Sequence, residues 1–184
     1  GMFSFVLLWS FVFADYQKQR ILTFMHPLTD IEGAGYNARQ SVIAVGSGGL
    51  LGKGVGFGTQ SRLQFLPEYE TDFIFAAFVE EWGIVGAVIL FFLFALVIGR
   101  IILDAIYGAS NFETLFGAGF AIFLMSHVAI NMGMNIGILP VTGIPLPFMS
   151  YGGSHLLTEF AGLGILMGMR RYARLAHRDD IANE

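Results

Sequence analysis

Three carboxylates lie at the start of, or inside, a long apolar run of the sequence. Asp72 directly precedes the run 73–99, which only Glu80 and Glu81 interrupt. A carboxylate at a membrane surface can act as a general base that takes the proton of an attacking hydroxyl group. Inside a membrane each carboxylate costs at least ~2.5 kcal/mol, so one of the two glutamates is expected to face a polar interior. Two plainer interpretations stay open: Asp72 as a helix N-cap, and Glu80 as a buried group satisfied by a neighbouring helix.

A glycine-rich segment with a lysine precedes this run. Nine of the 24 glycines lie between positions 33 and 58, in GAGYNARQSVIAVGSGGLLGKGVGFGTQ. The motif GSGGLLGKG departs from a nucleotide-binding phosphate loop, because Ser47 replaces its first glycine and Gly54 its final serine or threonine. Backbone amides together with Lys53 could still hold a phosphate, and tight loop packing is the other interpretation. Within this segment, 36–45 is expected to form a short amphipathic helix.

Polar residues with helical spacing follow in a second, uncharged run. His127, Asn131 and Asn135 are four residues apart and lie on one stripe of a helix. Such a stripe packs against another helix or lines a cavity, and contact between helices is the favoured interpretation. Further along, His155 and Glu159 are one helical turn apart and able to pair.

The composition is that of a membrane protein. Of the 184 residues, 55% are hydrophobic and 13% are charged, whereas soluble domains carry about 25% charged residues. The absence of cysteine excludes a disulfide framework and a thiolate metal site. The net charge of −4 argues against a nucleic-acid partner.

The apolar runs predict an all-α polytopic membrane protein, because about 20 apolar residues cross a ~30 Å hydrocarbon core. The uncharged run 114–158 is too long for one helix, and its prolines and glycines predict a re-entrant or broken outer segment. We expect one membrane domain with these parts: the end of a helix over 2–14, an extracellular loop over 15–71, spans over 72–99, 114–139 and 154–171, a cytoplasmic loop over 100–113, an outer loop over 140–153 and a cytoplasmic tail over 172–184.

Basic residues predict which side each loop occupies. Four arginines lie between positions 170 and 178, and basic residues near the ends of spans stay on the cytoplasmic side. Three expected spans separate this tail from 15–71. The long loop is therefore expected outside the cell, on the same side as 140–153.

Two long motifs resemble a known family. The stretch YQKQRILTFMHPLTDIEGAGYNARQSVIAVGSGGLLGKGVGFGTQSRLQFLPEYETDFIFAAFVEEWGIVG resembles the large extracellular loop and following helix of the SEDS family (shape, elongation, division and sporulation). NMGMNIGILPVTGIPLPFMSYGGS resembles the last outer loop of that family. GAGY, GTQSRLQFLPE and the HPLTD region are closer to RodA-like elongation members than to FtsW-like division members. Two residues depart from the family pattern: Glu70, where a histidine is common, and His155, where a small residue is common.

The resemblance implies a ten-helix fold and a peptidoglycan glycosyltransferase. Such a protein polymerises lipid II, the undecaprenyl-diphosphate-linked disaccharide peptide, at the outer face of the bacterial cytoplasmic (inner) membrane during cell elongation. Its implied partners are a class B penicillin-binding protein and other cell-elongation proteins. The essential aspartate of the family's TDFIF motif corresponds to Asp72. Because the chain matches only the C-terminal half of that fold, the fragment alone is expected to be inactive.

The residues agree with this chemistry. An acceptor hydroxyl attacks an anomeric carbon while a lipid diphosphate departs, and one inverting displacement needs one base, the role expected of Asp72. Lys53, Arg62 or a divalent cation could compensate the charge of the leaving group, and no other cofactor is predicted. The substrate-binding candidates are Lys53, Arg62, Glu68, Gln60 and Ser150. The structural polar residues expected inside the membrane are Glu80, His127, Asn131 and Glu159, and no residue is assigned to a metal.

Two other classes of function remain open from the residues. A flippase or transporter of lipid-linked precursors also has broken helices and intramembrane carboxylates. Such a carrier needs polar residues along its whole path, whereas here they gather near the expected outer face. A non-catalytic scaffold of the elongation machinery would tolerate replacement of Asp72.

Overall fold

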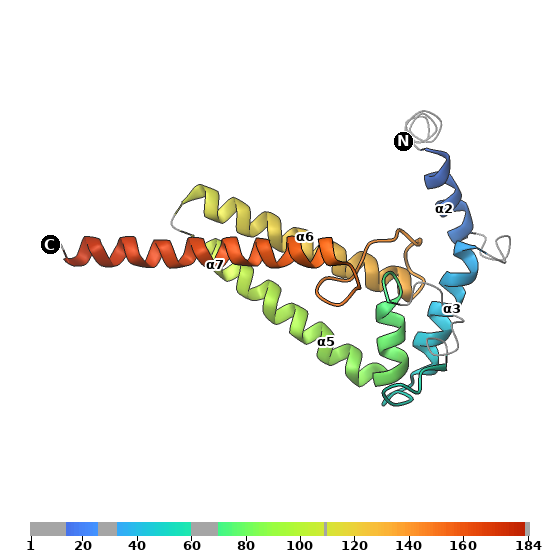
Figure 1. Ribbon diagram of the computed structural model, residues 1–184. Helices are drawn as coiled ribbons and strands as arrows, with labels where there is room; N and C mark the ends of the chain where they lie inside the picture. The colour runs from blue at the N-terminus through green and yellow to red at the C-terminus, as the bar shows by residue number, and fades with distance from the viewer. Residues whose placement is uncertain (1–13, 26–32, 60–69, 109, 183–184) are drawn as a thin grey trace.

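The computed structural model describes residues 14–25, 33–59, 70–108 and 110–182. The regular elements of this part of the chain are all helical, which confirms the predicted fold class. Figure 1 shows them: α2 (Asp15–Met25), α3 (Ala34–Ser47), α5 (Ile74–Ile106), α6 (Asn111–Asn135) and α7 (Gly153–Ala182). The short helix predicted over 36–45 is confirmed, because it lies inside α3. The helix end expected at 2–14 lies outside the described residues except for Ala14.

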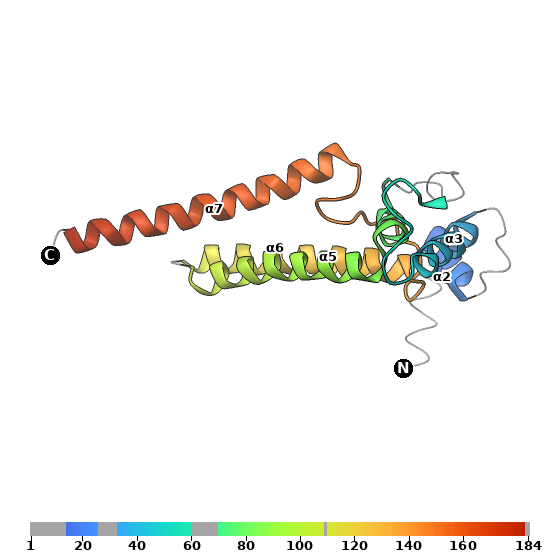
Figure 2. The same cartoon turned by 90° about the horizontal axis from the view of Figure 1, so that it is seen from below.

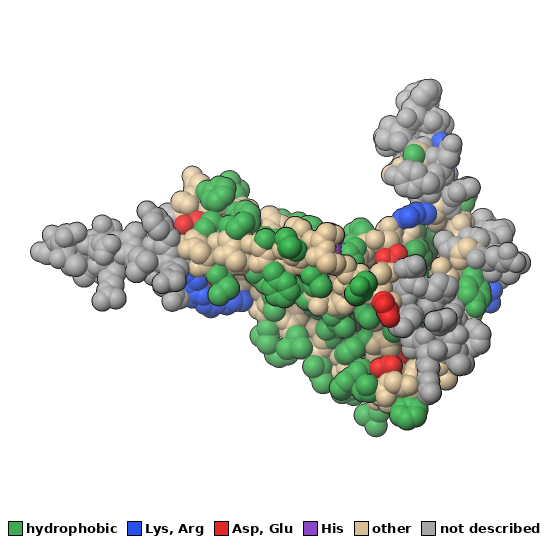
Figure 3. Space-filling model, viewed as in Figure 1, with side chains coloured by type: hydrophobic (Ala, Val, Ile, Leu, Met, Phe, Trp, Pro, Cys, Tyr) green, Lys and Arg blue, Asp and Glu red, His purple; other side chains and the backbone are tan. Residues whose placement is uncertain are grey.

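Two described helices are long and apolar enough to cross a membrane. They are α5 and α6, whose mean hydropathies reach 2.7 and 1.7. α5 continues to Ile106, into the expected loop 100–113, and α7 continues as one helix into the expected tail 172–184. In Figure 3, hydrophobic side chains are spread over the visible surface of α5 and α6. The exposed hydrophobic residues of α5 include Ile84, Val88, Phe91 and Phe92.

α5 is broken at Gly83. This residue has φ 69° and ψ −169°, outside the helical region, and Figure 1 shows the chain turning sharply there. A break in a membrane helix leaves backbone groups that need partners. The glycine-rich loop after α3 supplies them through four backbone hydrogen bonds: Lys53 N–H to Glu80 O (3.0 Å), Gly54 N–H to Glu81 O (3.0 Å), Ile84 N–H to Gly49 O (2.9 Å) and Val85 N–H to Leu50 O (3.1 Å).

Two glycines make this close docking possible. A Cβ atom on Gly52 would lie 2.0 Å from the carbonyl oxygen of Glu81, and one on Gly83 would lie 2.3 Å from the amide nitrogen of Gly52. Both residues also have positive φ, which glycine adopts without steric cost. The loop therefore packs tightly against the break. Its amides at Lys53 and Gly54 bind the protein's own carbonyls, so tight packing is the interpretation that the structure favours for this part of the loop.

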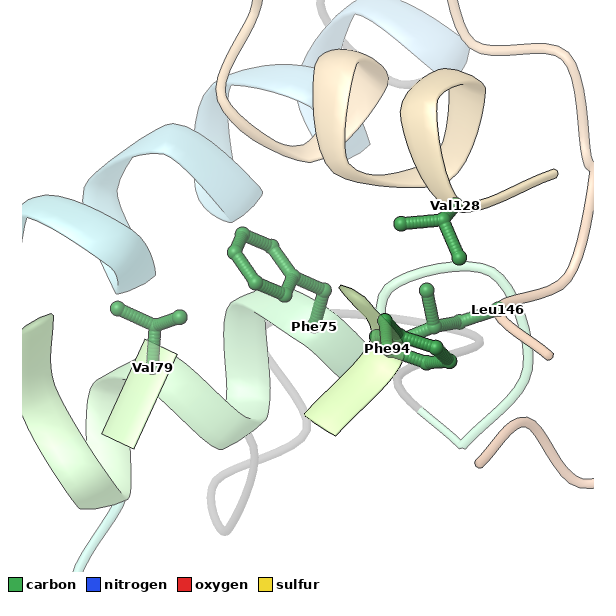
Figure 4. Packing of buried hydrophobic residues seen from close by; sticks show 5 residues of the cluster. All are labelled: Phe75, Val79, Phe94, Val128 and Leu146. Carbon is green, nitrogen blue, oxygen red and sulfur yellow. The ribbon is translucent and has the colours of Figure 1, made fainter. Parts of the chain in front are cut away.

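The core joins both halves of α5 to α6. Figure 4 shows its buried hydrophobic residues, Phe75, Val79, Phe94, Val128 and Leu146. Leu146 comes from the segment between α6 and α7, so this segment folds back onto the helices. Figure 2 shows α5 and α6 side by side, with α7 inclined to them. Leu163 and Leu166 of α7 pack against a second cluster that contains Leu124.

The sides of the membrane are testable on this cysteine-free chain. We expect a cysteine introduced at Val55, an exposed residue of the glycine-rich loop, to react with an impermeant thiol reagent in intact cells. A cysteine at position 183 is expected to react only after permeabilisation. Labelling of both positions from outside would contradict the predicted orientation.

Candidate active site

Asp72 lies in the turn before α5, where neighbouring segments hold the backbone on both sides of it. The side chain of Ser150, 1% exposed, donates a hydrogen bond of 2.6 Å to the carbonyl of Thr71 and accepts one of 2.7 Å from the amide of Leu146. The Tyr151 amide donates to the carbonyl of Glu70 at 2.8 Å. The loop between α6 and α7 therefore fixes the two residues that precede Asp72.

Two asparagines of α6 hold the other side of this turn. The side-chain amides of Asn131 and Asn135 both donate to the carbonyl of Asp72, at 3.0 and 3.1 Å. Asn131 also donates to the carbonyl of Ile144 at 2.8 Å. Both asparagines are fully buried. They therefore connect α6 to the start of α5, as expected for contact between helices.

The N-cap of α5 is Phe73, so Asp72 does not hold the capping position that one interpretation of the sequence gave it. Phe73 makes no side-chain capping hydrogen bond. The side-chain oxygen of Asn135 instead accepts the amide of Ala76 at 3.1 Å. In most helices a nearby N-cap side chain satisfies the free amides of the first turn. Here a residue of α6 satisfies one of them.

The carboxylate of Asp72 lies against a glycine of the loop between α6 and α7. A Cβ atom on Gly143, which has φ 74°, would lie 3.4 Å from Oδ2 of Asp72. The preceding residue, Thr142, accepts a hydrogen bond at its carbonyl from the guanidinium group of Arg20. A base candidate and an arginine therefore contact adjacent residues of one loop.

A cavity of about 340 Å³ lies beside this loop. Two of its lining residues are arginines, Arg20 from α2 and Arg39 from α3, and most of the others are apolar. The full lining consists of Arg20, Thr23, Phe24, Ala38, Arg39, Val42, Ile43, Gly137, Leu139 and Val141. Guanidinium groups bind phosphates well, and apolar walls suit a hydrocarbon chain. Neither arginine was among the substrate-binding candidates predicted from the sequence, although Arg20 lies in a motif, YQKQR, that carries the family resemblance.

Lys53 pairs with Glu80. Its ammonium group lies 2.7 Å from Oε1 of Glu80 and donates to the hydroxyl of Thr59 at 2.8 Å. Glu80 is fully buried and also accepts the amide of Thr59 at 2.8 Å and its hydroxyl at 2.9 Å. Glu80 is therefore a buried carboxylate satisfied within the protein, and its partner comes from the glycine-rich loop rather than from a neighbouring helix.

Three substrate-binding candidates, Gln60, Arg62 and Glu68, lie outside the described residues. His127 and Glu159 belong to a further cluster with His155, in which the pair expected from the spacing of His155 and Glu159 is present at 3.1 Å. Among the described residues, no group of three or more histidine, aspartate or glutamate side chains is arranged to hold a metal ion.

Comparison with known proteins establishes the class. The chain matches the sequence model of the FtsW/RodA/SpoVE family, described as cell cycle proteins, over residues 1–175, and it belongs to that family. It is 47% identical over 169 residues to the peptidoglycan glycosyltransferase MrdB of Escherichia coli K12, which covers 92% of this chain and 46% of that protein. It is 42% identical to the peptidoglycan glycosyltransferase RodA of Treponema pallidum, over 86% of this chain and 36% of that protein.

Solved structures agree with this assignment. A chain from a peptidoglycan synthase complex that coordinates polymerization and crosslinking matches with a TM-score of 0.68 and 32% identity, over 93% of this chain and 47% of that one. A mutant of the rod shape determining protein RodA of Thermus thermophilus matches with a TM-score of 0.53 and 30% identity, over 83% and 53%. The chain spans about half the length of its relatives or less.

Proposed function

We propose that the full-length protein containing this chain is a peptidoglycan glycosyltransferase that polymerises lipid II at the outer face of the bacterial cytoplasmic membrane during cell elongation. The observation that carries the proposal is the placement of Asp72. Its turn is held by hydrogen bonds from α6 and from the loop before α7, and that loop joins it to a cavity with two arginines and apolar walls. Relatives of the chain are named peptidoglycan glycosyltransferases.

In this proposal Asp72 is the general base. It takes the proton of the acceptor sugar hydroxyl while the hydroxyl oxygen attacks the anomeric carbon of the donor. The bond between that carbon and the diphosphate oxygen breaks, and the lipid diphosphate leaves with the bonding electron pair. One displacement of this kind inverts the configuration at the anomeric carbon. Hydrogen bonds to the backbone around Asp72 hold the base in place before the reaction, which is the condition for efficient proton transfer.

Arg20 and Arg39 compensate the charge of the leaving diphosphate. Both line the cavity, and guanidinium groups pair with phosphate oxygens in a fixed geometry. Val42 and Ile43, on the same helix as Arg39, offer an apolar surface to the prenyl chain. Arg62 remains a candidate for the same electrostatic role. Lys53 acts through Glu80, because its ammonium group is paired with that buried carboxylate.

A class B penicillin-binding protein is the proposed partner. One structural relative belongs to a peptidoglycan synthase complex in which polymerization and crosslinking are coordinated. Glycan strands made by the proposed reaction need crosslinking to form a wall, so a crosslinking enzyme is the natural consumer of the product.

The test is a polymerisation assay on lipid II in detergent with the full-length protein and its partner. We expect glycan chains from the full-length protein and none from residues 1–184 alone, because the exposed apolar face of α5 needs further helices or lipid to cover it. A flippase would give no product in this assay, since detergent leaves no membrane to cross. Chain formation by the fragment alone would show that the catalytic unit is smaller than proposed.

A further inference from the structure

His127, His155 and Glu159 form a row of close polar contacts between α6 and α7. Nε2 of His155 lies 3.3 Å from Nδ1 of His127, and Nδ1 of His155 lies 3.1 Å from Oε1 of Glu159. Oε2 of Glu159 accepts the amide of Phe148 at 3.0 Å. The contact with Phe148 joins these side chains to the segment between α6 and α7.

Glu159 is fully buried, so its carboxyl group needs polar surroundings. The amide of Phe148 donates to one of its oxygens, and the imidazole of His155 lies 3.1 Å from the other.

The residue that Glu159 holds has a costly backbone conformation. Phe148 has φ 60°, and among the described residues it is the one non-glycine with positive φ. Such a conformation persists only where surrounding contacts support it. The Glu159 carboxyl group binds its amide, and the ring of Phe160 packs edge-on against that of Phe148 with centroids 5.6 Å apart.

The turn around Phe148 is the one that reaches the candidate active site. In this turn the amide of Leu146 donates to the hydroxyl oxygen of Ser150, and the same hydroxyl group donates to the carbonyl of Thr71. The first hydrogen bond therefore orients the second. Two residues after Phe148, Ser150 thus holds the peptide that joins Thr71 to Asp72. The route from Glu159 to Asp72 runs through hydrogen bonds and one tight turn.

We propose that Glu159, oriented by His155 and His127, is a positioning residue for the catalytic Asp72, and this inference rests on the proposed function. Glu159 stabilises the Phe148 turn, and the turn places Ser150 against the backbone before Asp72.

The test compares Glu159→Ala with Glu159→Gln in the full-length protein. We expect Glu159→Ala to lower kcat for lipid II polymerisation by about 10- to 100-fold with KM changed less than about twofold, because a small misplacement of a catalytic group has effects of this size. Glu159→Gln is expected to recover most of kcat, since its oxygen can accept the Phe148 amide and its NH₂ group can donate to His155. Thr158→Ala, an exposed neighbour on α7, is the matched control.

Hydrogen exchange separates this inference from the proposed function. Glu159→Ala is expected to speed exchange at the amides of Phe148 and Ala76, and Glu159→Gln is not, whether or not the protein polymerises lipid II. In an Asp72→Asn background, Glu159→Ala is expected to cause no further loss of kcat. If Glu159→Ala does not fold, His155→Ala replaces it, with faster exchange at the same amides expected.

Two results would overturn the inference. One is a Glu159→Ala protein, or its replacement His155→Ala, whose kcat and exchange match those of Thr158→Ala. The other is an equal loss of kcat in Glu159→Ala and Glu159→Gln, which would assign the residue a charge-dependent role. A wild-type protein that makes no glycan would refute the proposed function, and the exchange data would still decide the coupling of Glu159 to the Asp72 turn.

Discussion

Replacing Asp72 by asparagine in the full-length protein is expected to lower the rate of lipid II polymerisation by about 10²- to 10⁴-fold, the usual contribution of a general base. Asparagine has nearly the same shape but cannot take the proton of the acceptor hydroxyl. The fold is expected to survive, because Asn131 and Asn135 hold the backbone carbonyl of this residue and Asn135 caps α5. Initial rates with the partner enzyme present, together with thermal unfolding in detergent, measure the two effects separately.

Glu81→Gln is the matched control for this substitution. It removes a carboxylate from α5, close in sequence to Asp72 but outside the candidate active site. It should leave the rate within about twofold of wild type, as for a substitution away from a functional group. A well-folded Asp72→Asn protein that polymerises lipid II at the wild-type rate would end the case for Asp72 as the base. It would favour the scaffold interpretation.

Removing the partner of Glu80 is expected to have the largest effect on stability. Lys53→Met leaves a fully buried carboxylate without its cation, and breaking a buried pair in this way costs about 3–5 kcal/mol. The double variant Lys53→Met/Glu80→Gln is expected to recover most of this loss. The side-chain oxygen of the glutamine that replaces Glu80 can still accept the amide of Thr59, and no buried charge is left uncompensated.

Thermal unfolding in detergent measures the stability of the two variants, and the polymerisation assay decides between two roles of Lys53. If Lys53 serves Glu80, the double variant regains both stability and turnover. If Lys53 binds the leaving diphosphate, the double variant regains stability while turnover stays low. A Lys53→Met protein as stable as wild type would show that another group compensates the charge of Glu80.

Local patterns in the sequence determined the class of the protein and its main candidate. The apolar runs predicted an all-helical membrane protein, and the motifs predicted the family and singled out Asp72. The four-residue spacing of His155 and Glu159 predicted their pairing, and the stripe of Asn131 and Asn135 predicted a contact between helices. These features depend on residues close in sequence or on a motif read as a unit, so periodicity and spacing report them.

Only the tertiary structure decided which distant residues meet. Lys53 reaches Glu80 across 27 positions, Asn135 caps α5 across 59, and Arg20 reaches Thr142 across 122. Each contact depends on the break of α5 at Gly83 or on the return of the loop before α7. Helical periodicity describes which face a residue occupies but not which segment covers that face. The partner of the buried carboxylate, the cap of α5 and the arginines of the cavity therefore follow from the folded path of the backbone.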